Sequence, residues 1–319
     1  MKRIAVLTTG GDAPGMNPAI RSVVRYGISK NLKVLGIMRG WWGLVNEELR
    51  EFDHHSVSGI ISQGGTILKT GRCPEFAKKE YQDRAFNTIK KNAIDGLVVI
   101  GGNGSFTAAH HFGETYNVAC VGIPASIDND INGIDLTIGS DTAINTALAA
   151  VDNIRDTATS MERIFVIEVM GRECGFIALS VALAGGCEDV LIPELKPDWE
   201  RMCHDIVQGN IRGKLSWIVV VAEGAGSAID IANKITEFTS LETRAVVLGH
   251  VQRGGRPTAF SRDLALRLGE AAVDSLLKGR RNIAVGLCCG KISEVDFATA
   301  IKKKEIKAEY WYNLIKTLT

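Results

Sequence analysis

Two carboxylates stand two residues apart, Asp128 and Asp130, shortly after the apolar run 118–123. In an extended segment residues i and i+2 share a face, so we expect both carboxylates to point the same way. Open α/β sheets place their chemistry at the carboxyl ends of strands. There one carboxylate can accept a proton from a hydroxyl while the other holds charge or a metal. A turn is the alternative interpretation, because Asp-Asn-Asp favours turns through local hydrogen bonds.

Two glycine-rich loops follow other apolar runs. The run 96–100 leads into Gly-Gly-Asn-Gly-Ser, and the run 3–8 leads into Thr-Gly-Gly-Asp-Ala-Pro-Gly. Glycine lets the backbone approach a phosphate closely, and the helix expected after each loop offers free N–H groups. Together with the aspartate loop they favour a phosphate-rich ligand. The Walker pattern is absent and no strict G-x-G-x-x-G follows a strand, which argues against a P-loop enzyme and a dinucleotide site.

Several arginines stand beside glycines or at the ends of apolar runs. A guanidinium can bind a phosphate through two parallel hydrogen bonds, and ligands of α/β sheets sit at strand ends. For the one most isolated in sequence, Arg244, a solvated surface charge is the simpler interpretation. The set is Arg72, Arg163, Arg172, Arg244 and Arg253.

Apolar runs and helical stretches alternate along the chain. This alternation predicts an α/β fold with mostly parallel sheets and helices on both faces. The lysine-rich segment 298–307 is predicted to be a helix with a solvated face. Strands are expected at 2–8, 33–38, 96–100, 118–123, 164–169, 188–192, 217–222 and 283–287.

The composition narrows the function classes. At 319 residues the chain is long enough for two domains with substantial cores. A net charge of +1 gives no field that favours nucleic acid, and no apolar run approaches the roughly 18 residues of a membrane span. Seven scattered cysteines without a C-x-x-C pair fit a reducing cytoplasm. We therefore expect a cytoplasmic enzyme that binds neither nucleic acid nor a membrane.

Several motifs stand in order along the whole chain. They are Gly-Gly-Asp-Ala-Pro-Gly-Met-Asn at 10–17, Arg-Cys-Pro-Glu-Phe at 72–76, Ile-Asp-Asn-Asp at 127–130, Ile-Arg-Asp-Thr-Ala at 154–158, Val-Met-Gly-Arg at 169–172, Ala-Glu-Gly at 222–224 and Gly-His-Val-Gln-Arg-Gly-Gly at 249–255. In these motifs the chain resembles the bacterial ATP-dependent 6-phosphofructokinase family, with one residue inserted near 110–120.

The resemblance implies the phosphofructokinase fold, two Rossmann-like three-layer lobes with mostly parallel sheets. Each lobe would be built from two separate segments. The larger, nucleotide-binding lobe would contain 1–139 plus 257–305. The smaller, sugar-phosphate-binding lobe would contain 140–256 plus 306–319.

The resemblance also implies a reaction and roles within it. The γ-phosphoryl group of MgATP would pass to the 1-hydroxyl of fructose 6-phosphate, giving fructose 1,6-bisphosphate and ADP, the committed step of glycolysis. Asp128 would accept the hydroxyl proton, Asp130 would assist, and Arg72 and Arg172 would stabilise the phosphoryl group, with Gly11 and Ser126 completing the catalytic set. The nucleotide would contact Gly11, Arg72, Cys73, Gly102, Asn103, Gly104 and Ser105, and Mg²⁺ would lie at Asp130 and Asn103.

A sugar-phosphate site shared between subunits is implied as well. Arg163 and Arg244 would reach the 6-phosphate from a neighbouring subunit, which makes the protein an obligate oligomer, a tetramer by family habit. These contacts would not distinguish tagatose 6-phosphate. The residues that shape the site would be Ser126, Asp128, Asp130, Arg163, Met170, Gly171, Arg172, Glu223, Arg244, His250 and Arg253.

An effector site for ADP and phosphoenolpyruvate is implied in part. Arg21 and Arg25 lie one helical turn apart and should share a face. His54 stands where the family has arginine and Ser216 where it has histidine, so a reduced or retuned response is expected. The matching residues are Arg21, Arg25, Arg155, Gly186, Glu188, Arg212, Gly213 and Lys214.

Asn103 is the departure with the largest expected effect. The family has an aspartate there that serves Mg²⁺, and an asparagine keeps the oxygen but loses the charge. We expect metal-linked activity roughly 10- to 100-fold weaker. Two alternatives stay open: a weakly active or non-catalytic regulatory paralogue that binds sugar phosphate or nucleotide, and a pyrophosphate-dependent enzyme. Gly104 and Ala125, where the pyrophosphate-dependent branch has aspartate and lysine, argue against the second.

Overall fold

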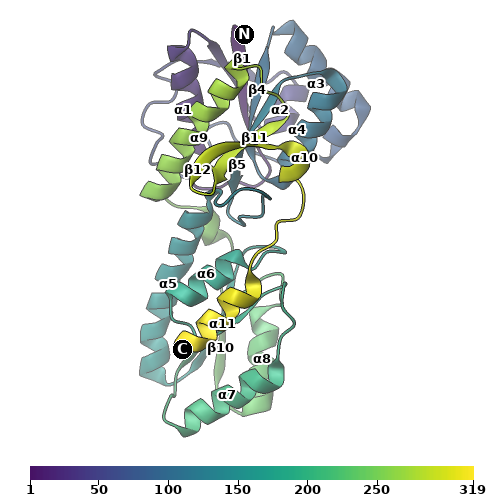
Figure 1. The fold of residues 1–319 in the computed structure, drawn as a ribbon. Coiled ribbons are helices and arrows are strands. Elements are labelled where there is room, and N and C mark those ends of the chain that lie inside the picture. The colour runs from purple at the N-terminus through teal and green to yellow at the C-terminus, as the bar shows by residue number, and fades with distance from the viewer. The chain divides into compact units, whose positions relative to one another are not determined.

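The computed structural model describes all 319 residues, and they divide into two compact units of two segments each. The first unit contains 1–142 and 253–304, and the second contains 143–252 and 305–319. The boundaries that the family resemblance implies differ from these by a few residues. The predicted α/β class with mostly parallel sheets is confirmed (Figure 1).

The first unit holds an eight-stranded sheet in the order β12-β11-β5-β4-β1-β2-β3, with β6 paired to β5. The strands at the two ends of this order, β3 and β12, are antiparallel to their neighbours, and the others are parallel. The strands are β1 (Arg3–Thr9), β2 (Lys33–Ile37), β3 (Leu49–Phe52), β4 (Gly96–Gly101), β5 (Cys120–Ser126), β6 (Ile138–Gly139), β11 (Ile283–Cys288) and β12 (Lys291–Asp296).

Helices cover both faces of this sheet. On one face α1 and α9 pack against each other, and α2, α3 and α4 lie on the other (Figure 1). The helices are α1 (Met16–Ser29), α2 (Gly40–Val45), α3 (Lys79–Lys91), α4 (Asn103–Tyr116), α9 (Ala259–Leu277) and α10 (Phe297–Ala300), with a 3₁₀ helix η1 at Pro74–Ala77.

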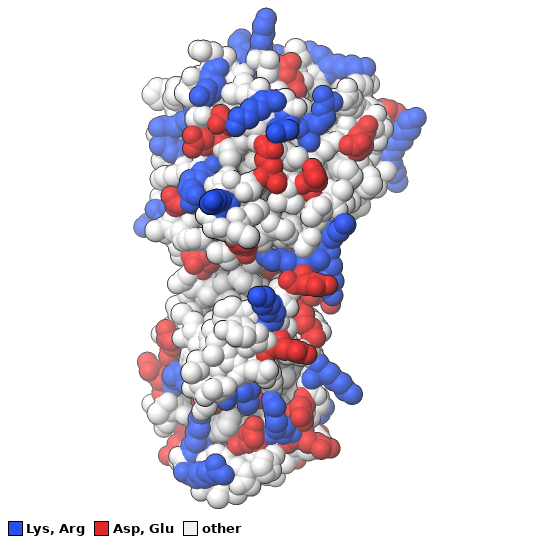
Figure 2. Space-filling view, in the orientation of Figure 1, with Lys and Arg blue, Asp and Glu red and all other residues white.

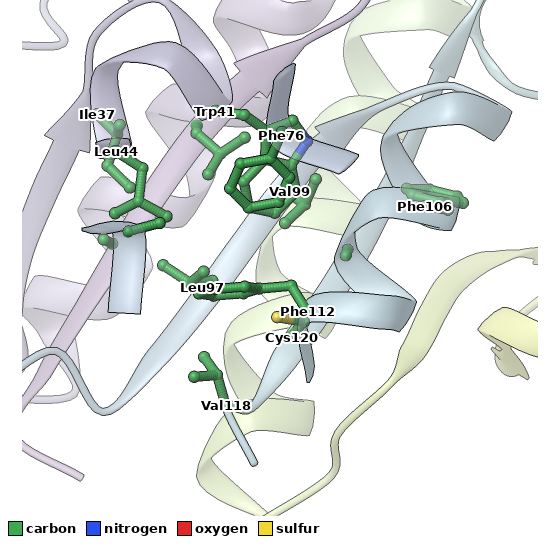
Figure 3. Close-up of a cluster of buried hydrophobic side chains, with 14 of the residues drawn as sticks. Ile37, Trp41, Leu44, Phe76, Leu97, Val99, Phe106, Phe112, Val118 and Cys120 are labelled. Carbon is green, nitrogen blue, oxygen red and sulfur yellow. The ribbon is translucent and has the colours of Figure 1, made fainter. Parts of the chain in front are cut away.

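The core of the first unit explains why β4 is central. Every residue of Gly96–Gly101 is buried, as expected for a parallel strand covered on both faces. On one face Leu97 and Val99 belong to a buried cluster with Trp41 of α2 and Phe106 and Phe112 of α4 (Figure 3). The sheet and these helices are therefore held together beneath the loops that follow the strands.

The second unit holds a four-stranded parallel sheet in the order β10-β7-β9-β8. On one face Val166 and Val219 pack against Ile206 of α7 and Ile235 of α8. The elements are α5 (Ser140–Met161, whose first residues belong to the first unit), β7 (Ile164–Val169), α6 (Phe176–Ala184), β8 (Asp189–Leu191), α7 (Trp199–Ile211), β9 (Trp217–Ala222), α8 (Ala228–Thr239), β10 (Thr243–Val247), η2 (Gly249–Arg253) and α11 (Ala308–Leu318).

Three expectations about local structure need correction. The single helix predicted for 298–307 is wrong, because α10 ends at Ala300 and α11 begins only at Ala308. Between them Lys304 Nζ donates to the carbonyl oxygen of Ile134 at 2.7 Å, so this lysine is partly buried rather than solvated. The strands β3, β10 and β12 were not predicted.

No helix of the structure is both long and apolar enough to span a membrane. On the face shown in Figure 2, lysine and arginine side chains are interspersed with aspartate and glutamate side chains.

Candidate active site

Three loops expected to carry chemistry meet at one edge of the first unit's sheet. Strands β5, β4 and β1 are consecutive neighbours and parallel, so the segments after Ser126, Gly101 and Thr9 leave the sheet side by side. In this sheet β1 lies between β2 and β4, so the chain continues to one side of β1 first and then to the other side. Such a reversal of strand order is where open α/β sheets bind ligands.

Close packing joins the loop after β4 to the loop after β1. Ser105 Oγ donates to the carbonyl oxygen of Thr9 at 3.0 Å, and both groups are buried. A Cβ on Gly101 would lie 2.4 Å from Ser105 Oγ, so this position requires glycine. A Cβ on Gly104 would meet nothing within 4 Å. The N-terminus of α4 therefore presents accessible backbone to a ligand, and its free N–H groups suit a phosphate.

Arg72 is held at the same edge by the loop that carries it. Thr70 Oγ1 donates to the carbonyl oxygen of Gly10 at 2.9 Å, and the amide of Gly10 donates to the carbonyl oxygen of Gly71 at 3.4 Å. Arg72 itself is exposed and Cys73 is partly buried. Burial raises the pKa of the Cys73 thiol, which keeps it protonated near neutral pH.

An aromatic stack supports this loop from below. Phe76 of η1 stacks on Trp41 of α2, with ring centroids 4.4 Å apart and planes at 19° (Figure 3). Trp41 is only 3% exposed, so in this structure its ring packs into the core rather than facing solvent. This contact could not be predicted from the sequence, because Trp41 and Phe76 are far apart along the chain.

The aspartate pair lies in a turn, and the extended conformation expected from the sequence is wrong. Strand β5 ends at Ser126, and Asn129 between the two aspartates has φ of 53°. Asparagine tolerates this left-handed conformation. Its side chain fixes the turn, because Asn129 Nδ2 donates to the carbonyl oxygen of Asp135 and Oδ1 accepts from the amide of Thr137.

The two carboxylates therefore have different environments. Asp128 is 3% exposed, whereas Asp130 is partly exposed. Ser126 Oγ donates to Asp130 Oδ1 at 2.9 Å and accepts from the amide of Asp128 at 3.3 Å. A buried carboxylate at a strand end can accept a proton, and a partly exposed one beside it can bind a cation.

Position 11 requires glycine because a side chain there would collide with Arg253. Arg253 Nη1 donates to the carbonyl oxygen of Asp12 at 3.0 Å, and a Cβ on Gly11 would lie 2.7 Å from the same nitrogen. Any side chain at position 11 would displace the guanidinium. The structure thus brings together the predicted residues of the first unit, from Gly11 to Arg253, along one sheet edge.

In the second unit, residues after β7 and β9 form a cradle. Glu223 Oε1 accepts from the amides of Gly171 at 3.2 Å and of Arg172 at 2.8 Å. Arg172 has φ of 51°, and a Cβ on Gly224 would lie 2.0 Å from its carbonyl oxygen. Met170, Gly171, Arg172 and Glu223 therefore lie together, as neighbouring parallel strands require. His250, beyond the carboxyl end of β10, is exposed.

Arg163 and Arg244 do not belong to this cradle. Arg163 precedes β7, Met170 follows it, and the six residues of the strand separate them by roughly 20 Å. Arg244 is the second residue of β10, beside Phe165 of β7, and so lies at the same amino end as Arg163. Both guanidiniums bind one carboxylate that the sequence analysis did not single out, Glu242.

The expected effector residues fall into both units. Arg21 Nη1 and Arg25 Nη2 donate to the carbonyl oxygens of Val57 and His54, so these two arginines share a face of α1, as predicted. Burial and the neighbouring Arg25 lower the pKa of Arg21.

The residues of the second unit that were expected to bind an effector surround a buried carboxylate. Glu188 is 5% exposed and accepts from the amide of Ile218 at 2.7 Å. Lys214 Nζ lies 3.1 Å from its Oε1, and Arg155 Nη1 lies 3.9 Å away. Arg155 also donates to the carbonyl oxygens of Gly185 and Gly186. Glu188, Lys214 and Arg212 line a cavity of about 370 Å³, while Gly213 is exposed beside it.

Comparison with protein families and known proteins agrees with these motifs. Residues 3–276 match the family model for phosphofructokinase. An ATP-dependent 6-phosphofructokinase of Clostridium acetobutylicum is 52% identical over 301 residues, which cover 94% of each chain. The ATP-dependent 6-phosphofructokinase of Clostridium botulinum strain Hall is 48% identical over 319 residues, the whole of both chains.

Solved structures agree in fold. Phosphofructokinase from Saccharomyces cerevisiae matches with a TM-score of 0.91 and 33% identity over all of this chain, which spans about half, 48%, of the yeast chain. Pichia pastoris phosphofructokinase in the T-state matches with a TM-score of 0.89 and 36% identity, covering 94% of this chain and 35% of that one. A pyrophosphate-dependent phosphofructokinase from Marinobacter aquaeolei, 23% identical, shares the fold with a TM-score of 0.86, over 97% and 86% of the two chains. The predicted resemblance is confirmed, and the chain belongs to the phosphofructokinase family.

Proposed function

We propose that this chain transfers the γ-phosphoryl group of MgATP to the 1-hydroxyl of fructose 6-phosphate, giving fructose 1,6-bisphosphate and ADP. The observation that carries the proposal is the buried carboxylate of Asp128, fixed by a braced turn at the sheet edge where Arg72 and the N-terminus of α4 also lie. Phosphoryl transfer needs positioning, charge neutralisation and one base, and this edge offers all three.

The roles follow from the environments of the groups. Asp128 accepts the proton of the attacking hydroxyl, and its isolation from bulk water supports that role. Arg72 and Arg172 stabilise the charge on the transferring phosphoryl group, because a guanidinium matches phosphate oxygens in geometry and charge. The backbone at Gly11 and at Gly102–Ser105, together with Cys73, binds the nucleotide phosphates.

Mg²⁺ fits the side chains of this edge with one carboxylate rather than two. Asp130 is partly exposed, and its Oδ1 is oriented by the Ser126 hydroxyl. Asn103 Nδ2 donates to the carbonyl oxygen of Ile301 at 3.3 Å, and the side-chain Oδ1 is the atom that could bind a cation. We assign the charged ligand to Asp130 and a neutral one to Asn103. When bound with ATP, Mg²⁺ would supply neutralisation of the phosphate charge.

The sugar phosphate is assigned to the cradle at Met170–Arg172 and Glu223, with His250 and Arg253, and its 6-phosphate to Arg163 and Arg244. Because these two arginines lie at the opposite end of β7 from the cradle, they can serve the site only from a second copy of the chain. That separation supports a homo-oligomer, and a tetramer is proposed from the family resemblance.

Regulation and location complete the proposal. Glu188 with Lys214 and Arg155, and separately Arg21 with Arg25, are charged groups suited to anionic effectors such as ADP or phosphoenolpyruvate. His54 offers α1 its backbone carbonyl, and an exposed histidine there is a weaker anion ligand than an arginine. A weakened effector response is therefore expected. A cytoplasmic location is part of the proposal, and the use of MgATP as donor is consistent with it.

A coupled assay for fructose 1,6-bisphosphate tests the function, with MgATP and pyrophosphate as alternative donors. The proposal predicts turnover with MgATP and none with pyrophosphate. The hydrogen bond that Asn103 Nδ2 donates to the carbonyl oxygen of Ile301 favours one competing account, a regulatory paralogue without a working metal site. No turnover in the unmodified chain and recovery in Asn103→Asp would establish that account instead.

A further inference from the structure

A single exposed carboxylate joins the two arginines at the amino end of the second unit's sheet. Glu242 Oε2 accepts from Arg163 Nε at 2.9 Å, and Glu242 Oε1 accepts from Arg244 Nη2. Each oxygen thus holds one guanidinium. The exposed fractions of the side chains are 27% for Arg163, 48% for Glu242 and 56% for Arg244, so the group lies at the surface.

The register of two strands produces this grouping. Thr243 of β10 pairs with Ile164 of β7, and the amide of Ile164 donates to the carbonyl oxygen of Glu242 at 3.3 Å. Glu242 therefore lies across from Arg163 on the neighbouring chain segment. Side chains two residues apart along a strand share a face, which puts Arg244 on the same side as Glu242.

The ion pairs leave most of the donors of both arginines available. A guanidinium has five N–H donors, and each arginine spends one nitrogen on Glu242. Arg163 keeps both Nη groups and Arg244 keeps Nε and Nη1. Two positive charges with one negative charge leave this group of three side chains with a net positive charge. A phosphate monoester, with three acceptor oxygens, matches this set of donors.

We propose that Glu242 is a positioning residue, which holds Arg163 and Arg244 at a fixed spacing so that both reach one phosphate group. This inference rests on the proposed function, which gives these arginines to the 6-phosphate of fructose 6-phosphate. Without Glu242, two long side chains of like charge would repel each other, and the phosphate would have to order both as it binds.

Orientation outweighs repulsion at this position. The Glu242 carboxylate opposes an arriving phosphate, but all three side chains are at least a quarter exposed, so water and salt screen that repulsion. The ordering of two guanidiniums is not screened by solvent. Removing the carboxylate charge is therefore expected to weaken sugar-phosphate binding rather than strengthen it.

The test is steady-state kinetics of Glu242→Gln and Glu242→Asp in the intact oligomer. Glutamine removes the charge and its single oxygen can accept from only one arginine. The half-saturating fructose 6-phosphate concentration should therefore rise about 2- to 10-fold, which corresponds to the loss of two partly exposed ion pairs. Aspartate keeps the charge on a shorter side chain, so the half-saturating fructose 6-phosphate concentration should rise less in Glu242→Asp. In both variants kcat and the KM for MgATP should stay unchanged.

A matched control and the oligomer size separate this role from a structural one. Glu237→Gln changes the same residue type at an exposed position of α8 and should leave every kinetic constant unchanged. Light scattering should give the same mass for all variants. Tighter or unchanged fructose 6-phosphate binding in Glu242→Gln, or a fall in kcat alone, would overturn the inference. A lack of fructose 6-phosphate turnover in the unmodified chain would instead defeat the proposed function.

Discussion

The two units place their candidate groups differently with respect to their sheets. In the first unit the candidate catalytic and nucleotide-binding groups lie at one edge, at or beside the carboxyl ends of β1, β4 and β5. In the second unit Met170–Arg172 lies at the carboxyl end of β7, but Arg163 lies at its amino end, roughly 20 Å away. One edge can be assembled within one chain, whereas groups at opposite ends of a strand can meet one small ligand only through a second copy.

The candidate groups of the two units also differ in burial. Asp128 is 3% exposed and its turn is fixed by Asn129, while Arg244 is 56% exposed on the edge strand β10. A proton acceptor benefits from a fixed, desolvated position. A group that must meet a ligand held by another subunit has to lie at the surface. The difference fits the two tasks that we propose, proton transfer at Asp128 and phosphate recognition at Arg244.

The largest expected effect is on the base. Asp128→Asn removes the proton acceptor while keeping the shape of the side chain, so kcat should fall by about 10²- to 10⁴-fold. The coupled assay measures this, with a melting curve to check the fold. Asp135→Asn, the same substitution at an exposed position of the same segment, should leave kcat nearly unchanged. An Asp128→Asn enzyme as fast as the unmodified chain would remove Asp128 from the mechanism.

The aromatic support of the Arg72 loop should show a smaller but clear effect. Trp41→Ala leaves a cavity beside Phe76 and should lower the free energy of unfolding by about 3–5 kcal/mol. It should also raise the KM for MgATP, because the loop loses its anchor. Trp42→Ala is the matched control, since Trp42 is adjacent in sequence but 42% exposed. Equal losses of stability in denaturant titrations of the two variants would contradict this account.

Asn103→Asp should show two opposed and smaller effects. The carboxylate cannot donate to the Ile301 carbonyl oxygen, so the melting temperature should drop by about 2–4 °C. The added charge should at the same time lower the half-saturating free Mg²⁺ concentration by roughly tenfold. Calorimetry and a Mg²⁺ titration measure the two. Unchanged Mg²⁺ dependence would mean that residue 103 does not contribute to the metal site.

The central strands could be predicted from the sequence, and the edge strands could not. β4 and β9 are buried at every residue and read as continuous apolar runs. The unpredicted strands β3, β10 and β12 each lie at an end of a sheet, where exposed and charged residues interrupt the apolar pattern. The pattern of a buried parallel strand cannot identify such segments.

The candidate residues could be identified from motifs, but their contacts could not. The motifs that contain Ser105 and Asp128 were identified from the sequence, whereas the strand order that brings them to one sheet edge comes from the structure. Glu242 gave no signal, because its partner Arg163 is distant in sequence and the strand that aligns them was not predicted. The pairing of Asn103 with Ile301 was likewise hidden, since the segment around 301 was expected to be helical.

The most direct test of a shared sugar-phosphate site is a mixed oligomer of Arg172→Ala and Arg244→Ala subunits. Each variant alone should have lost most activity, because every site lacks one of the two arginines. If one subunit supplies Arg172 and another supplies Arg244, each of the two is intact with a probability of about one half after random mixing. About a quarter of the sites should then contain both arginines. We predict recovery of about a quarter of the unmodified activity, whereas no recovery above the two parents would contradict the shared site.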